Sequence, residues 1–159
     1  MKGFLKIINK LFLLLGIFNA SSIQSNAQLV TETKQQNSFS LFNAVIYVDK
    51  NDFDLVKKSA ELLQQDIEMV TGKKLAITND LRSTSQTVII IGTIERSSAI
   101  KDLIKSKKLN ANNIKGKWEA YLLQSLPNSL IIAGSDRRGV AYGVFEISKM
   151  IKSITLRDR

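Results

Sequence analysis

Short apolar runs separated by polar turns predict the strands of one sheet. Two of these runs, at residues 87–91 and 130–133, are almost continuously apolar and contain β-branched side chains. Such runs are typical of strands that are buried on both faces. Three further strands are expected at residues 44–48, 75–78 and 119–126.

The clearest helical pattern covers residues 53–71. Its apolar positions recur at steps of three and four, which places them on one face of a helix that packs on a sheet. We expect this face to contain Val56, Ala60, Leu63, Ile67 and Val70, widened by Leu55, Leu62 and Met69. Asn51 or Asp52 is expected to cap the start of this helix, and Gly72 to close its end in a left-handed turn.

Two further helices are predicted from capping residues and apolar spacing. Ser97 or Ser98 is expected to cap a helix that ends near Lys108. After Gly134 ends the preceding strand, Ser135 or Asp136 is expected to cap a last helix. The buried face of that helix is predicted at Val140, Val144, Ile147 and Ile151, with Ala141 and Phe145 alongside.

The predicted order is strand, helix, strand, strand, helix, strand, strand, helix. The most apolar strand, residues 87–91, is expected to be central and to end at Gly92. Pro127 and Asn128 turn one strand directly into the next, so those two strands form a hairpin. Because hairpins and crossovers are mixed, the sequence predicts an α/β (α+β) domain, with a mixed sheet of about five strands packed against three helices.

The first residues have the pattern of a secretion signal. Three lysines precede a short apolar core, and small residues at 25–27 fit cleavage after Ala27. The apolar core is too short for a membrane-spanning helix, which needs roughly 20 residues. We therefore expect a periplasmic or extracellular protein with a signal peptide at 1–27, a flexible lead-in at 28–43, a domain at 44–151 and a truncated tail at 152–159.

The composition argues against several classes of site. The chain has no cysteine and no histidine, so we expect no disulfide, no Ser-His or Cys-His nucleophile and no usual zinc ligand set. The formal charge is +9, and loss of three lysines with the signal lowers it to +6. Such an excess favours solubility and does not by itself indicate nucleic-acid binding. We expect no cofactor, and no membrane association after signal cleavage.

Residues 134–139 lie at the start of a predicted helix, where free backbone amides attract anions, so one hypothesis is a phosphate-binding loop. A nucleotide loop needs Lys and then Ser or Thr after its last glycine, whereas apolar residues follow here. The sequence favours a tight strand-to-helix turn in which Asp136 caps the helix. Arg137 and Arg138 are then expected to pair with nearby groups.

Asp49, Asp52 and Asp54 crowd one turn before the first helix. Three carboxylates suggest a calcium ion, but they lack the alternation and the distal glutamate of a calcium loop. Helix capping explains them better, so we expect a solvated helix start. No pair of carboxylates has a spacing that indicates glycoside hydrolysis.

A basic stretch follows the second predicted helix, opposed only by Asp102. Its lysines are Lys101, Lys105, Lys107, Lys108, Lys115 and Lys117. Most such runs are a solvated face, with an acidic polysaccharide or a nucleic acid as alternative partners. Trp118 is expected in core or domain-interface packing, with a sugar platform as the alternative.

Four segments in sequence order resemble a known family. They are Leu-Leu-Gln-Gln-Asp-Ile-Glu-Met-Val-Thr-Gly at 62–72, Val-Ile-Ile-Ile-Gly-Thr at 88–93, Gly-Lys-Trp-Glu at 116–119 and Ile-Ala-Gly-Ser-Asp-Arg-Arg-Gly-Val-Ala-Tyr-Gly at 132–143. Across residues 44–151 the chain resembles the N-terminal domain of glycoside hydrolase family 115, the xylan α-glucuronidases. It is more distantly similar to the α/β domain of β-hexosaminidases and of family 67 α-glucuronidases.

The resemblance implies a secreted enzyme that removes glucuronic acid or its 4-O-methyl ether from xylan. In that family the catalytic carboxylates belong to a (β/α)8 barrel after this domain, so we assign no catalytic residue and no metal ligand. We expect a non-catalytic accessory domain, a fragment whose partner is the absent barrel. The alternatives are a carbohydrate-binding module for an acidic polysaccharide such as glucuronoxylan and a polyanion-binding protein. The candidate binding residues are Asp136, Arg137, Arg138 and Trp118; no nucleic-acid partner is expected.

Overall fold

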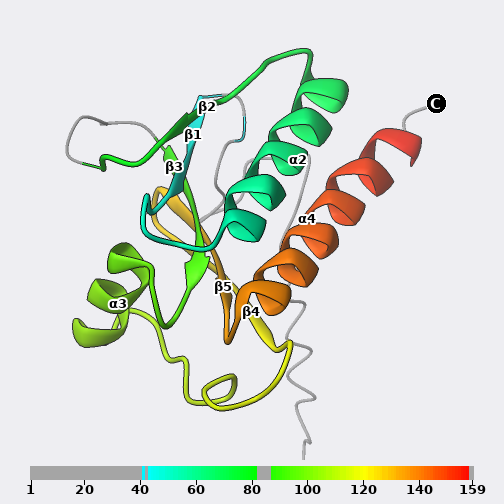
Figure 1. The fold of residues 1–159 in the computed structure, drawn as a ribbon. Coiled ribbons are helices and arrows are strands. Elements are labelled where there is room, and N and C mark those ends of the chain that lie inside the picture. The colour runs from blue at the N-terminus through cyan, green and yellow to red at the C-terminus, as the bar shows by residue number, and fades with distance from the viewer. Residues whose placement is uncertain (1–40, 42, 82–86, 158–159) are drawn as a thin grey trace, which may run out of the picture.

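The computed structural model describes residues 41, 43–81 and 87–157. The predicted signal peptide and most of the predicted lead-in lie outside the described residues. The order of elements confirms the prediction, with eight helices and strands in the described ranges (Figure 1). They are β1 (Ala44–Val48), α2 (Asp54–Thr71), β2 (Ala76–Thr78), β3 (Thr87–Thr93), α3 (Ser98–Lys105), β4 (Tyr121–Leu126), β5 (Ser129–Gly134) and α4 (Arg137–Arg157).

The strands form one mixed sheet in the order β2-β1-β3-β5-β4, so β3 is central as predicted. β1 pairs in parallel with β2 and β3, and β3 pairs in parallel with β5. β4 is antiparallel to β5, and Asn128 adopts a φ of 61° in the hairpin between them. The predicted α/β class with a mixed sheet of five strands is confirmed.

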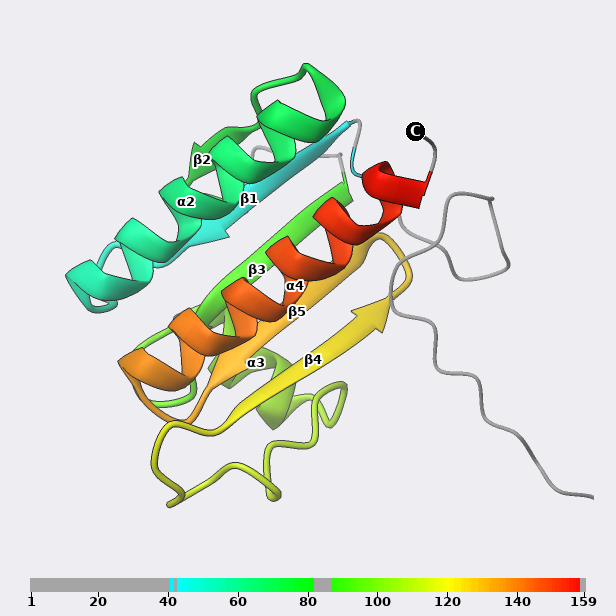
Figure 2. The same cartoon turned by 90° about the vertical axis from the view of Figure 1, so that its right-hand side faces the viewer.

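Helices cover both faces of this sheet, which explains why the central strands are apolar at successive positions. α2 and α4 lie side by side on one face, and α3 lies on the other (Figure 2). Along β1, Ile46 and Val48 point toward α2 and α4, whereas Val45 and Tyr47 point toward α3 and the turns after it. Alternate residues of each strand therefore enter two separate cores.

The faces of α2 and α4 that contact the sheet are narrower than predicted. Val56, Ala60, Leu63 and Ile67 of α2 and Val140, Ala141, Val144, Ile147 and Ile151 of α4 are buried, and Val70 is partly buried. Leu55, Leu62 and Met69 are 40%, 39% and 70% exposed, and Phe145 is 55% exposed. Their prediction as core residues is wrong, because they lie on the outer sides of the two helices.

Several predicted boundaries are corrected. β3 continues through Gly92 to Thr93, and α3 ends at Lys105 rather than near Lys108. α4 continues to Arg157, so the predicted tail begins as helix. Gly72 ends α2 as predicted, with a φ of 70° and its N–H donating to the Glu68 carbonyl at 2.8 Å.

No helix within residues 43–81 and 87–157 combines the length and the apolar character needed to cross a membrane.

The difference between buried and exposed apolar residues predicts a contrast in stability. Ile147 is fully buried, so Ile147→Ala should lower the free energy of unfolding by about 2–5 kcal/mol. Met69 is 70% exposed, and Met69→Ala should change it by less than about 0.5 kcal/mol. Urea unfolding followed by circular dichroism measures both, and losses of equal size would contradict this division of the two helices.

Candidate functional site

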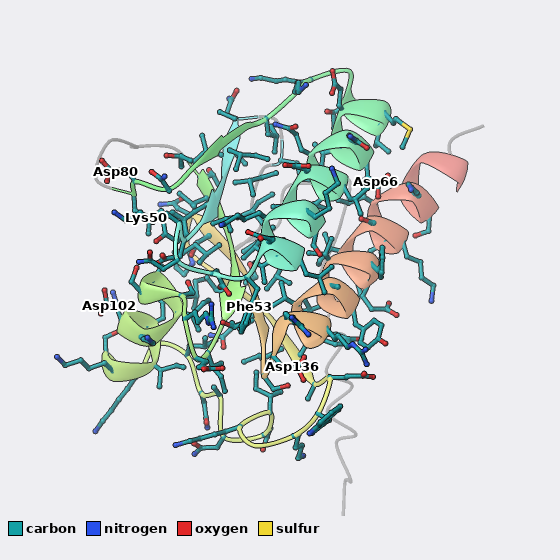
Figure 3. The ribbon with its side chains drawn as sticks, viewed as in Figure 1. Lys50, Phe53, Asp66, Asp80, Asp102 and Asp136 are labelled. Carbon is teal, nitrogen blue, oxygen red and sulfur yellow. The ribbon has the colours of Figure 1, made fainter. Side chains whose placement is uncertain are left out.

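The carboxyl ends of β1, β3 and β5 meet at one edge of the sheet, where open α/β sheets usually bind ligands. After β1 the chain enters α2 on one face, and after β3 it enters α3 on the opposite face. Because the chain leaves these two neighbouring strands toward opposite faces of the sheet, the topological switch point lies between β1 and β3. Figure 3 labels Phe53 and Asp136 at this edge.

Asp52 connects the start of α2 to the end of β3. It is 3% exposed, and its carboxylate accepts hydrogen bonds from Thr93 N at 2.8 Å, Thr93 Oγ1 at 3.0 Å and Phe53 N at 2.9 Å. The predicted capping role is wrong, because Phe53 is the N-cap of α2 and makes no side-chain hydrogen bond there. Asp52 instead joins two elements that are distant in sequence.

Asp49 connects the end of β1 to the start of α3. Its carboxylate accepts hydrogen bonds from Ser98 N and Ser98 Oγ, from Asn51 N and from the Tyr47 hydroxyl. Burial alone would raise the pKa of the Asp49 carboxyl, but these hydrogen bonds outweigh burial and lower the pKa. Burial, with the nearby Asp49 charge, raises the pKa of Tyr47.

The predicted solvated helix start is therefore wrong for Asp49 and Asp52, which are buried. It holds for Asp54, whose side chain is 98% exposed and pairs with Lys57 at 3.1 Å.

The space between the carboxyl ends of β1 and β3 is filled by side chains of the protein itself. A Cβ added to Gly92 would lie 2.4 Å from Ser97 Cβ and 3.1 Å from Asp52 Oδ2. Ser97 is fully buried, and its hydroxyl accepts a hydrogen bond from Ile100 N as the cap of α3. The usual ligand position of this fold is thus occupied by the protein itself.

The turn between β5 and α4 is also closed by internal hydrogen bonds. Asp136 accepts from Arg138 N at 2.9 Å, Gly139 N at 2.8 Å and Glu119 N at 2.9 Å. Burial opposes the charged form, but these three amides together lower the pKa of the Asp136 carboxyl. The predicted cap at Asp136 is confirmed, and the Asp136 carboxylate already occupies two amides of the first turn of α4.

Both arginines of this turn pair locally, as predicted. Arg138 Nη1 donates to Glu119 Oε1 at 2.8 Å. The Arg137 guanidinium lies 5.7 Å from the centroid of the Phe53 ring, and the Arg96 guanidinium lies 3.8 Å from the same centroid. These cation–π contacts connect the starts of α2, α3 and α4 at one corner.

Trp118 is 85% exposed, so the prediction that it packs in the core is wrong for this domain. Trp118 lies in the turn before β4, in which Gly116 and Glu119 have positive φ values of 73° and 56°. The predicted solvated basic face is confirmed, because all of its lysines are exposed; they are Lys101, Lys105, Lys107, Lys108, Lys115 and Lys117.

The four candidate binding residues form only a partial cluster. Asp136 and Arg138 both contact Glu119, one through its N–H and the other through its carboxylate. Trp118 precedes Glu119 in the chain, while Arg137 is directed toward Phe53. Asp136, Arg137 and Arg138 thus each contact other groups of this domain, which leaves the Trp118 indole as the free surface.

An open groove of about 590 Å³ lies between α2 and α4, on the outer side of the helix pair. Its lining residues are Leu62, Asp66, Phe145, Ser148, Lys149, Lys152 and Ser153. Lys152 Nζ lies 2.7 Å from Asp66 Oδ1, and the buried hydroxyl of Ser148 has no hydrogen-bond partner. The sequence pattern does not reveal this groove, because Leu62 and Phe145 have the helical spacing expected of core residues.

The described residues hold no group of three or more His, Cys, Asp or Glu side chains that could bind a metal. Glycoside hydrolysis usually needs two carboxyl groups roughly 5–10 Å apart across the sugar. In the groove, the one lining carboxylate is Asp66, which Lys152 neutralises. Asp49, Asp52 and Asp136 are held by the hydrogen bonds already described.

The role of Asp52 predicts a strong effect of its removal. Asp52→Ala should lower the free energy of unfolding by about 1–3 kcal/mol, because it leaves the buried Thr93 N–H without its acceptor. Asp54→Ala is the matched control in the same turn and should have almost no effect, because the Asp54 side chain is 98% exposed. Thermal unfolding measures both, and equal stability of the two variants would contradict the role of Asp52.

The lowered pKa of Asp136 predicts a pH dependence of stability. The stabilisation from ionised Asp136 is present above its ordinary pKa of 3.8 and is lost as the pH falls through the lower pKa of the folded state. Asp136→Asn should therefore be less stable than the parent at pH 7, by about 1–3 kcal/mol, and this difference should shrink as the pH falls below the ordinary pKa of 3.8.

Urea midpoints at pH 7 and pH 2.5 test this dependence, with Asp54→Asn as the exposed control. A constant difference between Asp136→Asn and the parent at both pH values would refute the assignment.

Comparison with known proteins agrees with this architecture. The sequence model described as the glycosyl hydrolase family 67 N-terminus matches residues 26–147. A solved structure, described as "A novel family GH115 4-O-Methyl-alpha-glucuronidase, BtGH115A, with specificity for decorated arabinogalactans", has a TM-score of 0.56 and 32% identity over 69% of this chain. CpGH84D has the same TM-score at 14% identity over 78% of this chain, a likeness of fold alone.

The chain spans 13% of the GH115 structure and 20% of the CpGH84D structure. No curated protein sequence matches it. The resemblance to the N-terminal domains of family 115 and family 67 enzymes is confirmed. Because the family model matches well over half of its residues, the chain belongs to the glycosyl hydrolase family 67 N-terminus family.

Proposed function

We propose that the chain is the non-catalytic N-terminal accessory domain of a secreted xylan α-glucuronidase. Such an enzyme hydrolyses glucuronic acid or 4-O-methylglucuronic acid from xylan, and this domain acts as a scaffold for its catalytic barrel. The observation that carries the proposal is the 32% identity to a stretch that makes up only 13% of a 4-O-methyl-α-glucuronidase. Residues 1–27 would serve as the secretion signal, cleaved after Ala27.

The geometry of the carboxyl edge supports an accessory role. Asp49, Asp52 and Asp136 each accept hydrogen bonds from two or more protein groups, so they are tied to structure rather than aimed at a substrate. A general acid also needs a raised pKa, whereas the pKa values of Asp49 and Asp136 are lowered. Both features favour a catalytic site on another domain of the enzyme.

We infer the substrate of the proposed enzyme from a related enzyme. The related GH115 enzyme is described as specific for decorated arabinogalactans. The feature common to that description and to glucuronoxylan is a 4-O-methylglucuronic acid side group. A test of activity therefore has to include both polysaccharides.

We expect the purified chain alone to release no uronic acid from glucuronoxylan or from arabinogalactan decorated with 4-O-methylglucuronic acid. Liquid chromatography of the products after prolonged incubation measures the release, with the related GH115 enzyme as the positive control. Turnover by this chain, abolished by Asp66→Asn and retained by Asp54→Asn, would overturn the accessory role.

A carbohydrate-binding module is the second candidate, favoured by the 85% exposure of Trp118. An exposed indole can stack on the apolar face of a sugar. Titration calorimetry with glucuronoxylan distinguishes the two functions: heat that Trp118→Ala removes would support the module, and absence of heat at millimolar sugar would leave the accessory role alone.

A further inference from the structure

Two guanidinium groups lie beside one aromatic ring at the carboxyl edge of the sheet. The Arg96 guanidinium is 3.8 Å from the centroid of the Phe53 ring, and the Arg137 guanidinium is 5.7 Å from the same centroid. We call these three side chains the arginine corner. Phe53 is the N-cap of α2, Arg96 lies between β3 and α3, and Arg137 is the first residue of α4. Figure 3 labels Phe53 at this edge.

The arginine corner brings two like charges together without a counter-ion. One guanidinium on an aromatic ring is a common stabilising contact, but a second one beside the same ring adds repulsion between the two cations. Arg138, the next residue in the chain, forms an ion pair with Glu119. Within the described residues, neither Arg96 nor Arg137 forms one. An anion from outside the chain would remove this repulsion.

The carboxylates of the neighbouring turns do not provide that anion. Asp52 and Asp136 accept hydrogen bonds from the backbone amides described above. Asp54 forms an ion pair with a lysine of its own helix. Glu95 is exposed and forms no ion pair with a described residue. The N–H donors of both guanidinium groups in the corner therefore remain available to a ligand.

The positions of the two arginines are also unusual for helix starts. Arg137 is in the first turn of α4, and Arg96 directly precedes Ser97, the cap of α3. The start of a helix carries a partial positive charge, so acidic side chains are favoured there and cations are disfavoured. Departures from such local preferences are expected at functional sites. The arginine corner is therefore a better candidate for binding than for stability.

A carboxylate fits the arginine corner in shape and in access. The planar fork of N–H donors on a guanidinium matches the two oxygens of a carboxylate. Arg96 and Arg137 are both exposed, so a ligand can approach them from solvent. Because Ser97 and Asp52 fill the space between β1 and β3, this exposed rim is the part of the carboxyl edge that a ligand can reach.

We propose that the arginine corner binds the carboxylate of a uronic acid residue in an acidic polysaccharide. This inference rests on the proposed function, which supplies the class of ligand, because the related enzyme is a 4-O-methyl-α-glucuronidase. The accessory domain then contributes a contact with the polysaccharide in addition to its role as a scaffold. The site differs from the one considered for Trp118, because it recognises a charge and not the apolar face of a sugar.

Binding of matched oligosaccharides to the unaltered chain tests the proposal. The acidic probe is a xylo-oligosaccharide with one 4-O-methylglucuronic acid side group, and its methyl ester is the same sugar without the charge. NMR titration of the isotope-labelled chain, followed on the arginine side-chain N–H signals, measures the dissociation constants. The acid should shift the signals of Arg96 and Arg137, and the ester should bind roughly tenfold more weakly, because it loses the charge-assisted hydrogen bonds.

Variants of the chain locate the binding. Arg96→Gln and Arg137→Gln should each weaken binding of the acid roughly tenfold. Lys105→Gln removes one exposed positive charge from the last turn of α3, and Trp118→Ala removes the exposed indole. Both are controls and should leave the dissociation constant unchanged. Circular dichroism checks the folding of each variant, and the comparison of acid and ester remains valid if a variant does not fold.

Several results would overturn the inference. Equal weakening by Lys105→Gln would assign the binding to general charge attraction, and loss with Trp118→Ala alone would assign it to the indole. Inorganic phosphate that binds more tightly than the acid would make the corner a phosphate site. Equal binding of acid and ester, or no binding of the acid, would also overturn the inference. The accessory role survives each of these results, because it needs no ligand on this chain, whereas release of uronic acid by the chain would overturn that role.

Discussion

Three parallel strands, β1, β3 and β5, end at one edge of the sheet, and the backbone N–H groups that follow them all need acceptors. Aspartates meet this requirement. Asp52 accepts from the end of β3, Asp49 from the start of α3, and Asp136 from the first turn of α4 and from the segment before β4. Each carboxylate joins segments that the sheet alone would not hold together.

This constraint has a consequence for function. In many α/β proteins the same edge binds ligands, because loops diverge there and leave a crevice with free amides. Here Gly92 allows Ser97 and Asp52 to fill the space, and Asp136 occupies amides that an anion would otherwise use. The edge that could have become an active site is used for structure, which fits a domain that supports chemistry placed elsewhere.

The sequence predicted the elements well because their signals are local. Buried runs, the glycine after α2 and the cap at Asp136 depend on residues a few positions apart. The roles of Asp49 and Asp52 escaped prediction because their partners, Ser98 and Thr93, are 49 and 41 positions away. A local explanation, capping, was available for both, and only the parallel register of β1 and β3 brings the distant donors close.

Leu55, Leu62, Met69 and Phe145 were misplaced for a different reason. Helical periodicity identifies an apolar side of a helix but not what covers that side. In α2 and α4 the sheet covers one part of the apolar arc, and the rest remains exposed around the groove. A core residue and a residue at a domain interface have the same pattern in the sequence.

The two faces of the domain therefore differ in what they can contact. On the α3 face, turns and exposed lysines cover the core between α3 and the sheet. This surface is suited to contact with water. On the α2 and α4 face, exposed apolar side chains lie on the outer sides of the two helices, above the core that the helices cover. Burying charged lysines opposes association, whereas burying apolar side chains drives it. The outer surface on the α3 side is thus rich in lysines, whereas the outer surface of α2 and α4 contains most of the exposed large apolar side chains of the described residues.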